Sequence, residues 1–211
     1  MQRRDPWTPL AGFLAALTFV VGVIFAADSP DSDDSAAKVL AWYADKGHRT
    51  GIIIGAYVLA FCGLFLLWFA SGLRQRLRDA EGPEGRLANV ALGGGFLLVG
   101  MLWVGAVALA AVPAGKSLGG SPLETADVAR FFPSLGFGAI LLFGMFAAIA
   151  MIEATSIVIL RTGVFPRWLA WLGFACGVVL LFGVVFLPII ALPIWLIATS
   201  VVLTRSPAPA G

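Results

Sequence analysis

Residues 51–72 read GIIIGAYVLAFCGLFLLWFASG and contain no charged side chain. A helix needs about 20 apolar residues to cross a hydrocarbon core of about 30 Å. Within a bilayer the backbone must satisfy its own hydrogen bonds, which a helix does and a single extended segment does not. This stretch therefore predicts a helix that crosses a membrane.

The composition of the whole chain points to the same class of protein. Of its 211 residues, 60% are hydrophobic and 12% are charged, and the mean hydropathy is +0.95. Soluble domains carry about 25% charged residues. The formal net charge is +2, so no strong basic field indicates a nucleic-acid partner. We expect an integral membrane protein whose main partner is the lipid bilayer and which binds no nucleic acid.

Four apolar runs are long enough to cross the bilayer once, namely residues 9–27, 51–72, 88–112 and 135–160. A fifth run, 168–204, would extend about 55 Å as one helix, which is too long for a single crossing. It contains Pro188 and Pro193, and a proline removes one helical hydrogen bond and clashes with the preceding turn. We therefore expect a hairpin of two short helices, 168–186 and 190–204.

The predicted fold class is all-α: a polytopic transmembrane helix bundle of six spans, in a single domain over residues 1–204. The first apolar run has about 19 residues, whereas that of a signal peptide has about 7–15. We therefore interpret 9–27 as a retained span. Residues 205–211, RSPAPAG, are expected to be disordered.

The distribution of positive residues predicts the orientation, because cytoplasmic loops are enriched in Lys and Arg. One set of loops and termini carries nine arginines: Arg3, Arg4, Arg74, Arg76, Arg78, Arg86, Arg161, Arg167 and Arg205. The two opposite loops carry five positive residues: Lys38, Lys46, Arg49, Lys116 and Arg130. Both termini are therefore predicted to lie in the cytoplasm, which requires an even number of spans.

The first of the two outer loops predicts a short amphipathic helix. Ser35 or Asp34 is the expected N-cap. Ala36, Val39 and Tyr43 then recur at helical spacing, and Gly47 is expected to end the helix.

The second outer loop, SPLETADVARFF (121–132), predicts another such helix. It opens with Ser121 and Pro122, and Glu124 follows three residues after the serine, as in a capping box. Pro133 is expected to end this helix before the next span begins. We expect both short helices to lie over the outer mouth of the bundle, with the lipid interface as the alternative location.

Glu153 is the one charged residue within the predicted span 135–160. The nearest charge in sequence is Arg161, eight residues on, which corresponds to about 12 Å of helix. Ionisable groups at such depth usually face the interior of a bundle. Ser156 and Ala150 share the face of the glutamate at helical spacing, which is consistent with an inward orientation. Because no predicted span holds a Lys or Arg to pair with it, we expect the carboxyl to be largely protonated near neutral pH.

Two interpretations of Glu153 stay open. It is either a proton-accepting or small-molecule site, with Tyr57, Trp103 and Ser156 as its companions, or a neutral acid that links two helices. Such a link contributes roughly 1–2 kcal/mol at best. The candidate hydrogen-bond partners lie on other spans: Tyr57, Trp103, Thr199 and Ser200.

The sequence contains no recognisable catalytic or metal-binding motif: it lacks a Walker loop, a G-x-S-x-G elbow and an H-E-x-x-H pair. His48 has no ligand neighbours at metal-site spacing. The acidic segment DSPDSDDS (28–35) would place Ala36 at the turn glycine and Trp42 at the bidentate glutamate of an EF-hand. The glycines at 93–95 open an apolar span, which indicates close helix packing rather than a phosphate loop. We predict no catalytic residue, no metal site and no cofactor.

The segment RTGVFPRWLAWLG (161–173) resembles a broad group of uncharacterised six-span bacterial membrane proteins, common in actinobacteria. The resemblance extends over most of the chain in layout, implies the six-span topology and supplies no site residue. The segment also has a direct physical interpretation. Gly163 can adopt the left-handed conformation that closes a helix, and Pro166 sets the entry to the next one.

Two functions remain open. The first is a non-enzymatic accessory or interaction component of the bacterial inner (plasma) membrane, which binds a protein partner or a second copy of itself. The alternative is a small transporter or ligand-binding membrane protein with a cavity around Glu153, whose ligand is a small hydrophobic molecule or a lipid.

Overall fold

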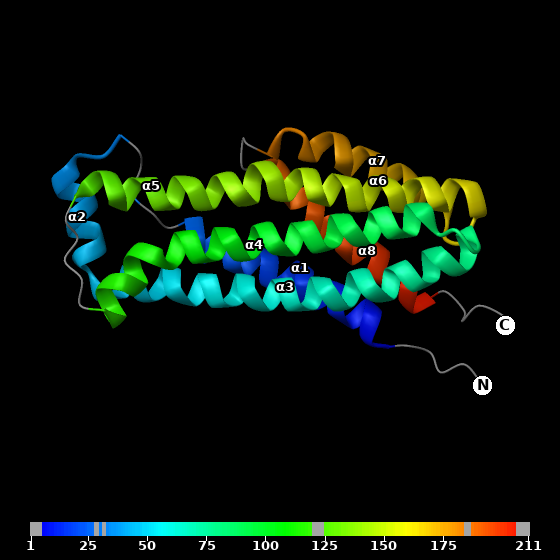
Figure 1. The fold of residues 1–211 in the computed structure, drawn as a ribbon, viewed down its shortest axis with the longest axis horizontal. Coiled ribbons are helices and arrows are strands. Elements are labelled where there is room, and N and C mark those ends of the chain that lie inside the picture. Colours follow the sequence, from blue (N-terminus) through cyan, green and yellow to red (C-terminus); the bar gives the residue numbers. More distant parts are fainter. Residues whose placement is uncertain (1–5, 28–29, 31–32, 120–124, 184–186, 206–211) are drawn as a thin grey trace.

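The computed structural model of the chain describes residues 6–27, 30, 33–119, 125–183 and 187–205. Within these ranges the regular structure is helical throughout, without a β-strand. The elements are α1 (Trp7–Ala27), α2 (Ala36–Ala44), α3 (Lys46–Glu81), α4 (Arg86–Leu118), α5 (Ala126–Phe137), the π-helical segment η1 (Gly138–Gly144), α6 (Met145–Thr162), α7 (Arg167–Leu180), the 3-10 segment η3 (Leu187–Ile190) and α8 (Ala191–Arg205). Figure 1 shows the long helices packed side by side along one axis.

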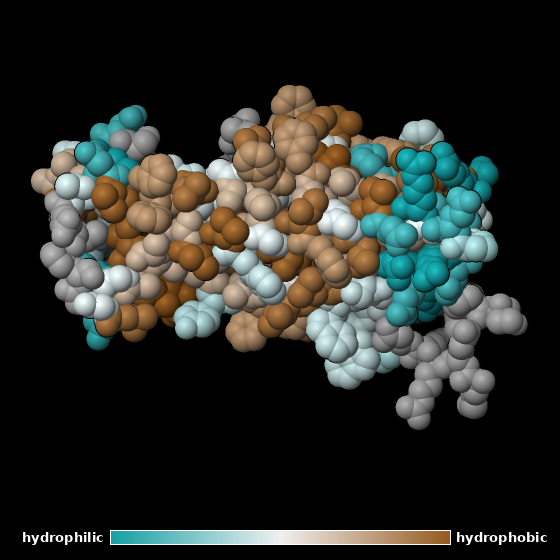
Figure 2. All heavy atoms as spheres, viewed as in Figure 1, coloured by the Kyte–Doolittle hydropathy of each residue, from teal (hydrophilic) through white to brown (hydrophobic). Residues whose placement is uncertain are grey.

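Five helical segments of the described chain are long and apolar enough to cross a membrane: Trp7–Phe25, Lys46–Glu81, Arg86–Leu118, Ala126–Thr162 and Pro188–Arg205. In Figure 2 their apolar side chains form a broad belt, and hydrophilic residues gather at the ends of the molecule. The chain is therefore a multi-pass membrane helix bundle.

The predicted span 168–186 is shorter in the structure than expected. Helix α7 has 14 residues, which corresponds to about 21 Å of helix, less than the hydrocarbon thickness of about 30 Å. The chain turns at residues 181–182, and 184–186 lie outside the described part. A sixth crossing therefore requires that α7 and this turn together extend across the hydrocarbon core.

The second outer helix does not end at Pro133, so that prediction is wrong. Pro133 lies inside α5, and α5, η1 and α6 follow one another without a break as one apolar segment, Ala126–Thr162. Long membrane helices tolerate proline because neighbouring groups and local changes of helix type satisfy the freed carbonyl. The observed N-cap is Thr125, whose hydroxyl accepts from the Val128 amide at 3.4 Å. The capping box predicted at 121–124 lies outside the described residues.

The first outer helix, α2, starts where predicted. Ser35 is its N-cap and accepts from the Lys38 amide at 3.3 Å. The helix ends at Ala44 rather than at Gly47, because the Asp45 carboxylate accepts from the amides of Gly47 and His48, at 2.7 and 3.1 Å, and so begins α3.

Two arginines hold α2 on the bundle. Arg49 of α3 donates to the carbonyls of Tyr43 and Ala44, at 2.8 and 2.6 Å, and to Ser117 Oγ of α4 at 3.2 Å. Arg130 of α5 donates to the carbonyl of Asp34. These bonds place α2 across the outer ends of α3 and α5, as Figure 1 shows.

Close contacts of helix backbones occur at particular glycines. A Cβ built on Gly94 of α4 would lie 2.6 Å from the Met151 amide nitrogen and 2.7 Å from the Ala147 carbonyl oxygen of α6. A Cβ on the adjacent Gly93 would meet no described atom within 4 Å. Of the glycines at 93–95, Gly94 is therefore the one that brings the α4 and α6 backbones together. The turn after α6 also follows its prediction, since Gly163 has φ 70° and caps the helix.

Gly94→Ala is expected to destabilise the protein, because an added methyl group overpacks a backbone contact that cannot move without shifting a helix. Overpacking costs about 1–3 kcal/mol. Gly93→Ala is the matched control, and it should be neutral or stabilising since Ala is the better helix former by about 1 kcal/mol. Thermal unfolding of both variants in the same detergent, followed by circular dichroism, tests this. Equal melting temperatures for the two variants would contradict the α4–α6 contact.

Tyr43 of α2 is buried, and burial raises its pKa to about 12. Its hydroxyl has no hydrogen-bond partner among the described residues. Because an unfolded phenol ionises near pH 10, the stability contributed by neutral Tyr43 should be complete below about pH 10 and decline towards pH 12. The chain has two tyrosines, so Tyr57→Phe isolates Tyr43. In that variant the phenolate absorbance should appear near pH 12, and a transition near pH 10 in the folded protein would refute the burial.

Candidate functional site

Glu153 lies on α6 where α7 passes beside it. A Cβ built on Gly177 of α7 would overlap the carboxyl oxygen Oε1 of Glu153. The carboxyl therefore rests directly on the α7 backbone, at a position that only glycine leaves open. The thiol of Cys176 lies within electrostatic range of the same carboxyl. No hydrogen bond reaches the Glu153 carboxyl from the residues that the structure describes.

The side chain of Glu153 lies half-buried at the contact between α6 and α7, on a different side of α6 from the contact with α4. Met151 is fully buried against Gly94 of α4. Glu153 follows two residues later, which is about 200° around the helix axis. On one flank of Glu153, Phe146, Ala150 and Ile157 are partly or largely exposed, with Phe146 at 54%, whereas Ser156 on its other flank is buried. Glu153 is therefore partly exposed on the lipid-facing side of α6, in a notch formed by Gly177.

We call these residues the α6 outer stripe: Phe146, Ala150, Glu153 and Ile157. They follow one another at spacings of four, three and four residues, which places them on one side of the helix.

Ser156 lies one turn from Glu153 but, unlike Glu153, is buried and hydrogen-bonded. It is fully buried, and its hydroxyl donates to the Ile152 carbonyl of its own helix at 2.8 Å. A Cβ on Gly173 of α7 would overlap this hydroxyl. Gly173 and Gly177 thus let α7 approach α6 along both polar side chains, as expected of two glycines four residues apart in membrane helices.

Tyr57 and Trp103 lie elsewhere, in a groove of about 290 Å³ between α3 and α4 whose lining does not include Glu153. Tyr57 is 67% exposed. Trp103 donates its indole N–H to the Ala60 carbonyl at 3.1 Å, across the α3–α4 contact. The structure therefore brings Glu153 together with Ser156 but not with Tyr57 or Trp103.

Thr199 and Ser200 do not partner Glu153 either. Both are fully buried on α8, and Ser200 lies over Gly12 of α1, where a Cβ would overlap its hydroxyl. Neither hydroxyl, nor the indole N–H of Trp195 one turn earlier, has a hydrogen-bond partner among the described residues. Thr155 and Ser156 of α6, by contrast, both donate to carbonyls of their own helix.

In the described ranges, no three His, Cys, Asp or Glu side chains are placed to hold a metal ion. The His48 ring stacks on Trp42, with ring centres 4.4 Å apart, and its Nδ1 lies 3.4 Å from the Trp42 carbonyl oxygen. His48 therefore packs the α2–α3 junction.

Comparison of the chain with protein-family models, with curated proteins and with solved structures found no match. The resemblance of residues 161–173 to six-span bacterial proteins accordingly stays a prediction.

Glu153 should react with a hydrophobic carbodiimide from the lipid phase, because it is a carboxyl partly exposed to hydrocarbon and no described cation lies beside it. Treatment of membranes with dicyclohexylcarbodiimide, followed by peptide mass analysis, should label the α6 peptide, and Glu153→Gln should abolish that label. Gly177→Ala removes the space under the carboxyl and should increase labelling. An unlabelled α6 peptide in the wild type would contradict the lipid-facing position.

Proposed function

We propose that this chain is a non-enzymatic accessory protein of the bacterial plasma membrane, which binds a second membrane protein or a second copy of itself through the α6 outer stripe. The observation that carries the proposal is the carboxyl of Glu153. It is partly exposed towards lipid and has no hydrogen-bond partner among the described residues.

A polar group in this position requires a partner that the described residues do not provide. Ionisable residues within membrane spans are costly and almost always pair with other groups. A protonated carboxyl offers one O–H donor and further acceptor capacity. A hydroxyl, an amide or a second carboxyl on a neighbouring helix would satisfy both.

The shape of the surface also supports contact with another helix. The α6 outer stripe has the spacing of a helix-packing seam, and Ala150 within it and Gly177 beside it are small. Small residues let membrane helices approach closely, and polar side chains between such helices form hydrogen bonds.

The pattern of charges supports a topology of six crossings with both termini in the cytoplasm. Figure 1 shows α1 beginning and α8 ending at the end of the molecule where the α3–α4 and α6–α7 turns lie. Arg74, Arg86, Arg161 and Arg205 belong to that end, and cytoplasmic segments are enriched in arginine. In this topology α7 and the turn after it form the fifth crossing.

The alternative function, a transporter or ligand-binding protein with a cavity around Glu153, has less support. Two grooves that described residues form are lined mainly by apolar and aromatic residues, and the lining of neither includes Glu153. In a transporter of this kind the Glu153 carboxyl would titrate, and substitution by glutamine distinguishes the two functions.

Glu153→Leu should weaken association, whereas Glu153→Gln should preserve it, because the amide keeps both a donor and an acceptor. One interhelical hydrogen bond contributes about 1 kcal/mol, which is roughly a fivefold change in affinity. The measurement is energy transfer between two differently labelled copies in native membranes, together with comparison of proteins that co-purify in mild detergent. Val178→Leu, on the exposed side of α7, serves as the control.

Equal association and equal co-purification for Glu153→Leu and the wild type would refute the proposal. Loss of a cellular phenotype in Glu153→Gln, with association intact, would instead favour a titrating site.

A further inference from the structure

A second surface feature, the α1–α3 groove, lies between the first and third helices. It has a volume of about 330 Å³ and is almost entirely apolar. Its lining consists of Trp7, Leu10, Ala11, Leu14, Phe65 and Trp68. We propose that this groove binds one acyl chain of an anionic phospholipid, whose phosphate is held by arginines at the adjacent end of α3.

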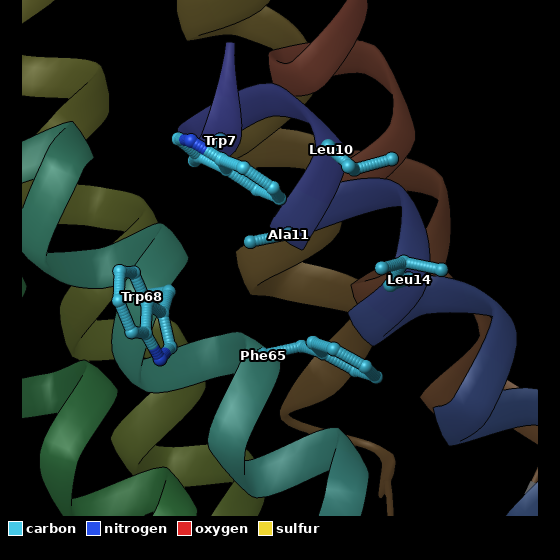
Figure 3. Close-up of a pocket in the computed structure, with 6 residues that line it drawn as sticks. All are labelled: Trp7, Leu10, Ala11, Leu14, Phe65 and Trp68. Atoms are coloured by element: carbon cyan, nitrogen blue, oxygen red, sulfur yellow. The ribbon is translucent and has the colours of Figure 1, made fainter. Parts of the chain in front are cut away.

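The geometry of the groove suits a chain-like apolar ligand that enters from the bilayer. Figure 3 shows Trp7 of α1 and Trp68 of α3 on either side of Ala11, with Leu14 and Phe65 further along the groove. Both tryptophans project outwards and are 65% and 68% exposed, whereas Ala11 is 6% exposed. The alanine therefore forms part of the floor, and the two indoles form the walls on the lipid side.

The length and polarity of the groove suit a flexible apolar chain. From Trp7 to Leu14 the groove follows about 10 Å of helix, and its lining is almost entirely apolar along this length. It can therefore hold an extended segment of an acyl chain.

The positive charge at one end of the groove selects the headgroup. Phe65, Gly72 and Arg76 share one side of α3, because Arg76 follows Phe65 by eleven residues, which is close to three full turns. Gly72 packs against Thr8 of α1, where the two helices meet below the groove. Arg76 lies about 12 Å beyond Trp68 along the helix, so a phosphate near this arginine places its acyl chain at the groove.

The surrounding charges fit an anionic rather than a zwitterionic lipid. The segments predicted to face the cytoplasm carry nine arginines but four acidic residues. Of these acids, Glu81 is engaged, since its carboxylate accepts from the amides of Leu87 and Ala88 at 2.9 Å each and caps α4. Basic pockets on the cytoplasmic side of membrane proteins bind anionic headgroups, and arginine binds phosphate through paired hydrogen bonds.

The second groove, between α3 and α4, provides a matched control within the same chain. It is also apolar, with a volume of about 290 Å³, and alanine again contributes to its lining at Ala110. It lies towards Leu118 and so near the opposite end of the bundle from the arginines. Filling either groove with the same substitution separates specific lipid binding from general contact with lipid.

The experiment uses the full-length protein, stripped of lipid in detergent and titrated with phosphatidylglycerol or with phosphatidylcholine of identical acyl chains. Native mass spectrometry counts the lipids bound at each concentration. The wild type should bind one phosphatidylglycerol about five- to thirtyfold more tightly than phosphatidylcholine, given one or two cationic contacts of about 1 kcal/mol each. Ala11→Leu should remove this binding step, and Ala110→Leu should leave it unchanged.

Arg76→Gln tests the headgroup contact without filling the groove. It should abolish most of the preference for phosphatidylglycerol while phosphatidylcholine binding stays the same. Equal binding of both lipids by the wild type, or equal binding by Ala11→Leu and Ala110→Leu, would overturn the proposal and leave only annular lipid. If Ala11→Leu fails to fold, the Arg76→Gln titration decides, and an unchanged preference overturns the assignment.

Discussion

The backbone contact between α4 and α6 at Gly94 fixes which side of α6 faces α4. In a bilayer, lipid is as apolar as a protein core, so helices associate through close packing and hydrogen bonds rather than through a hydrophobic driving force. Gly94 allows Met151 and Ala147 to approach to backbone distance. Gly105 and Gly136 repeat this contact between α4 and α5 further along, where a Cβ on either would lie 2.9 Å from the carbonyl oxygen of the other.

The rotation of α6 gives Glu153 its position. With Met151 facing α4, Glu153 faces away from the centre, and α7 covers one side of it with the backbone of Gly177. The carboxyl is thus held by packing but not paired by any described residue. A carboxyl buried at the centre of the bundle would indicate an internal site. A carboxyl partly exposed to lipid indicates association in the plane of the membrane. The two apolar grooves, between α1 and α3 and between α3 and α4, also open sideways towards the bilayer.

Features that depend on local sequence were predictable, and features that depend on neighbouring helices were not. Hydropathy predicted the long spans, Ser35 predicted the N-cap of α2, and Gly163 predicted the left-handed turn after α6. The sequence could not tell which glycine of 93–95 contacts α6. It misplaced the end of α5 because a proline that stops a helix in water is tolerated within a long membrane helix. The depth of Glu153 follows from counting residues, but its direction follows from where Met151 packs. One sequence feature indicated the contact of Glu153 with Gly177, namely the two glycines, Gly173 and Gly177, four residues apart in the next helix.

The lipid-facing position of Glu153 is most directly tested by oxygen accessibility of nitroxide labels in lipid nanodiscs. Labels are attached singly through Phe146→Cys, Glu153→Cys and Ser156→Cys, in a chain whose two native cysteines, both buried, are replaced by alanine. A label at position 153 should collide with molecular oxygen nearly as often as one at 146, while a label at 156 should be shielded by α7. A label at 153 as shielded as that at 156 would contradict the outward orientation and, with it, the proposed association surface.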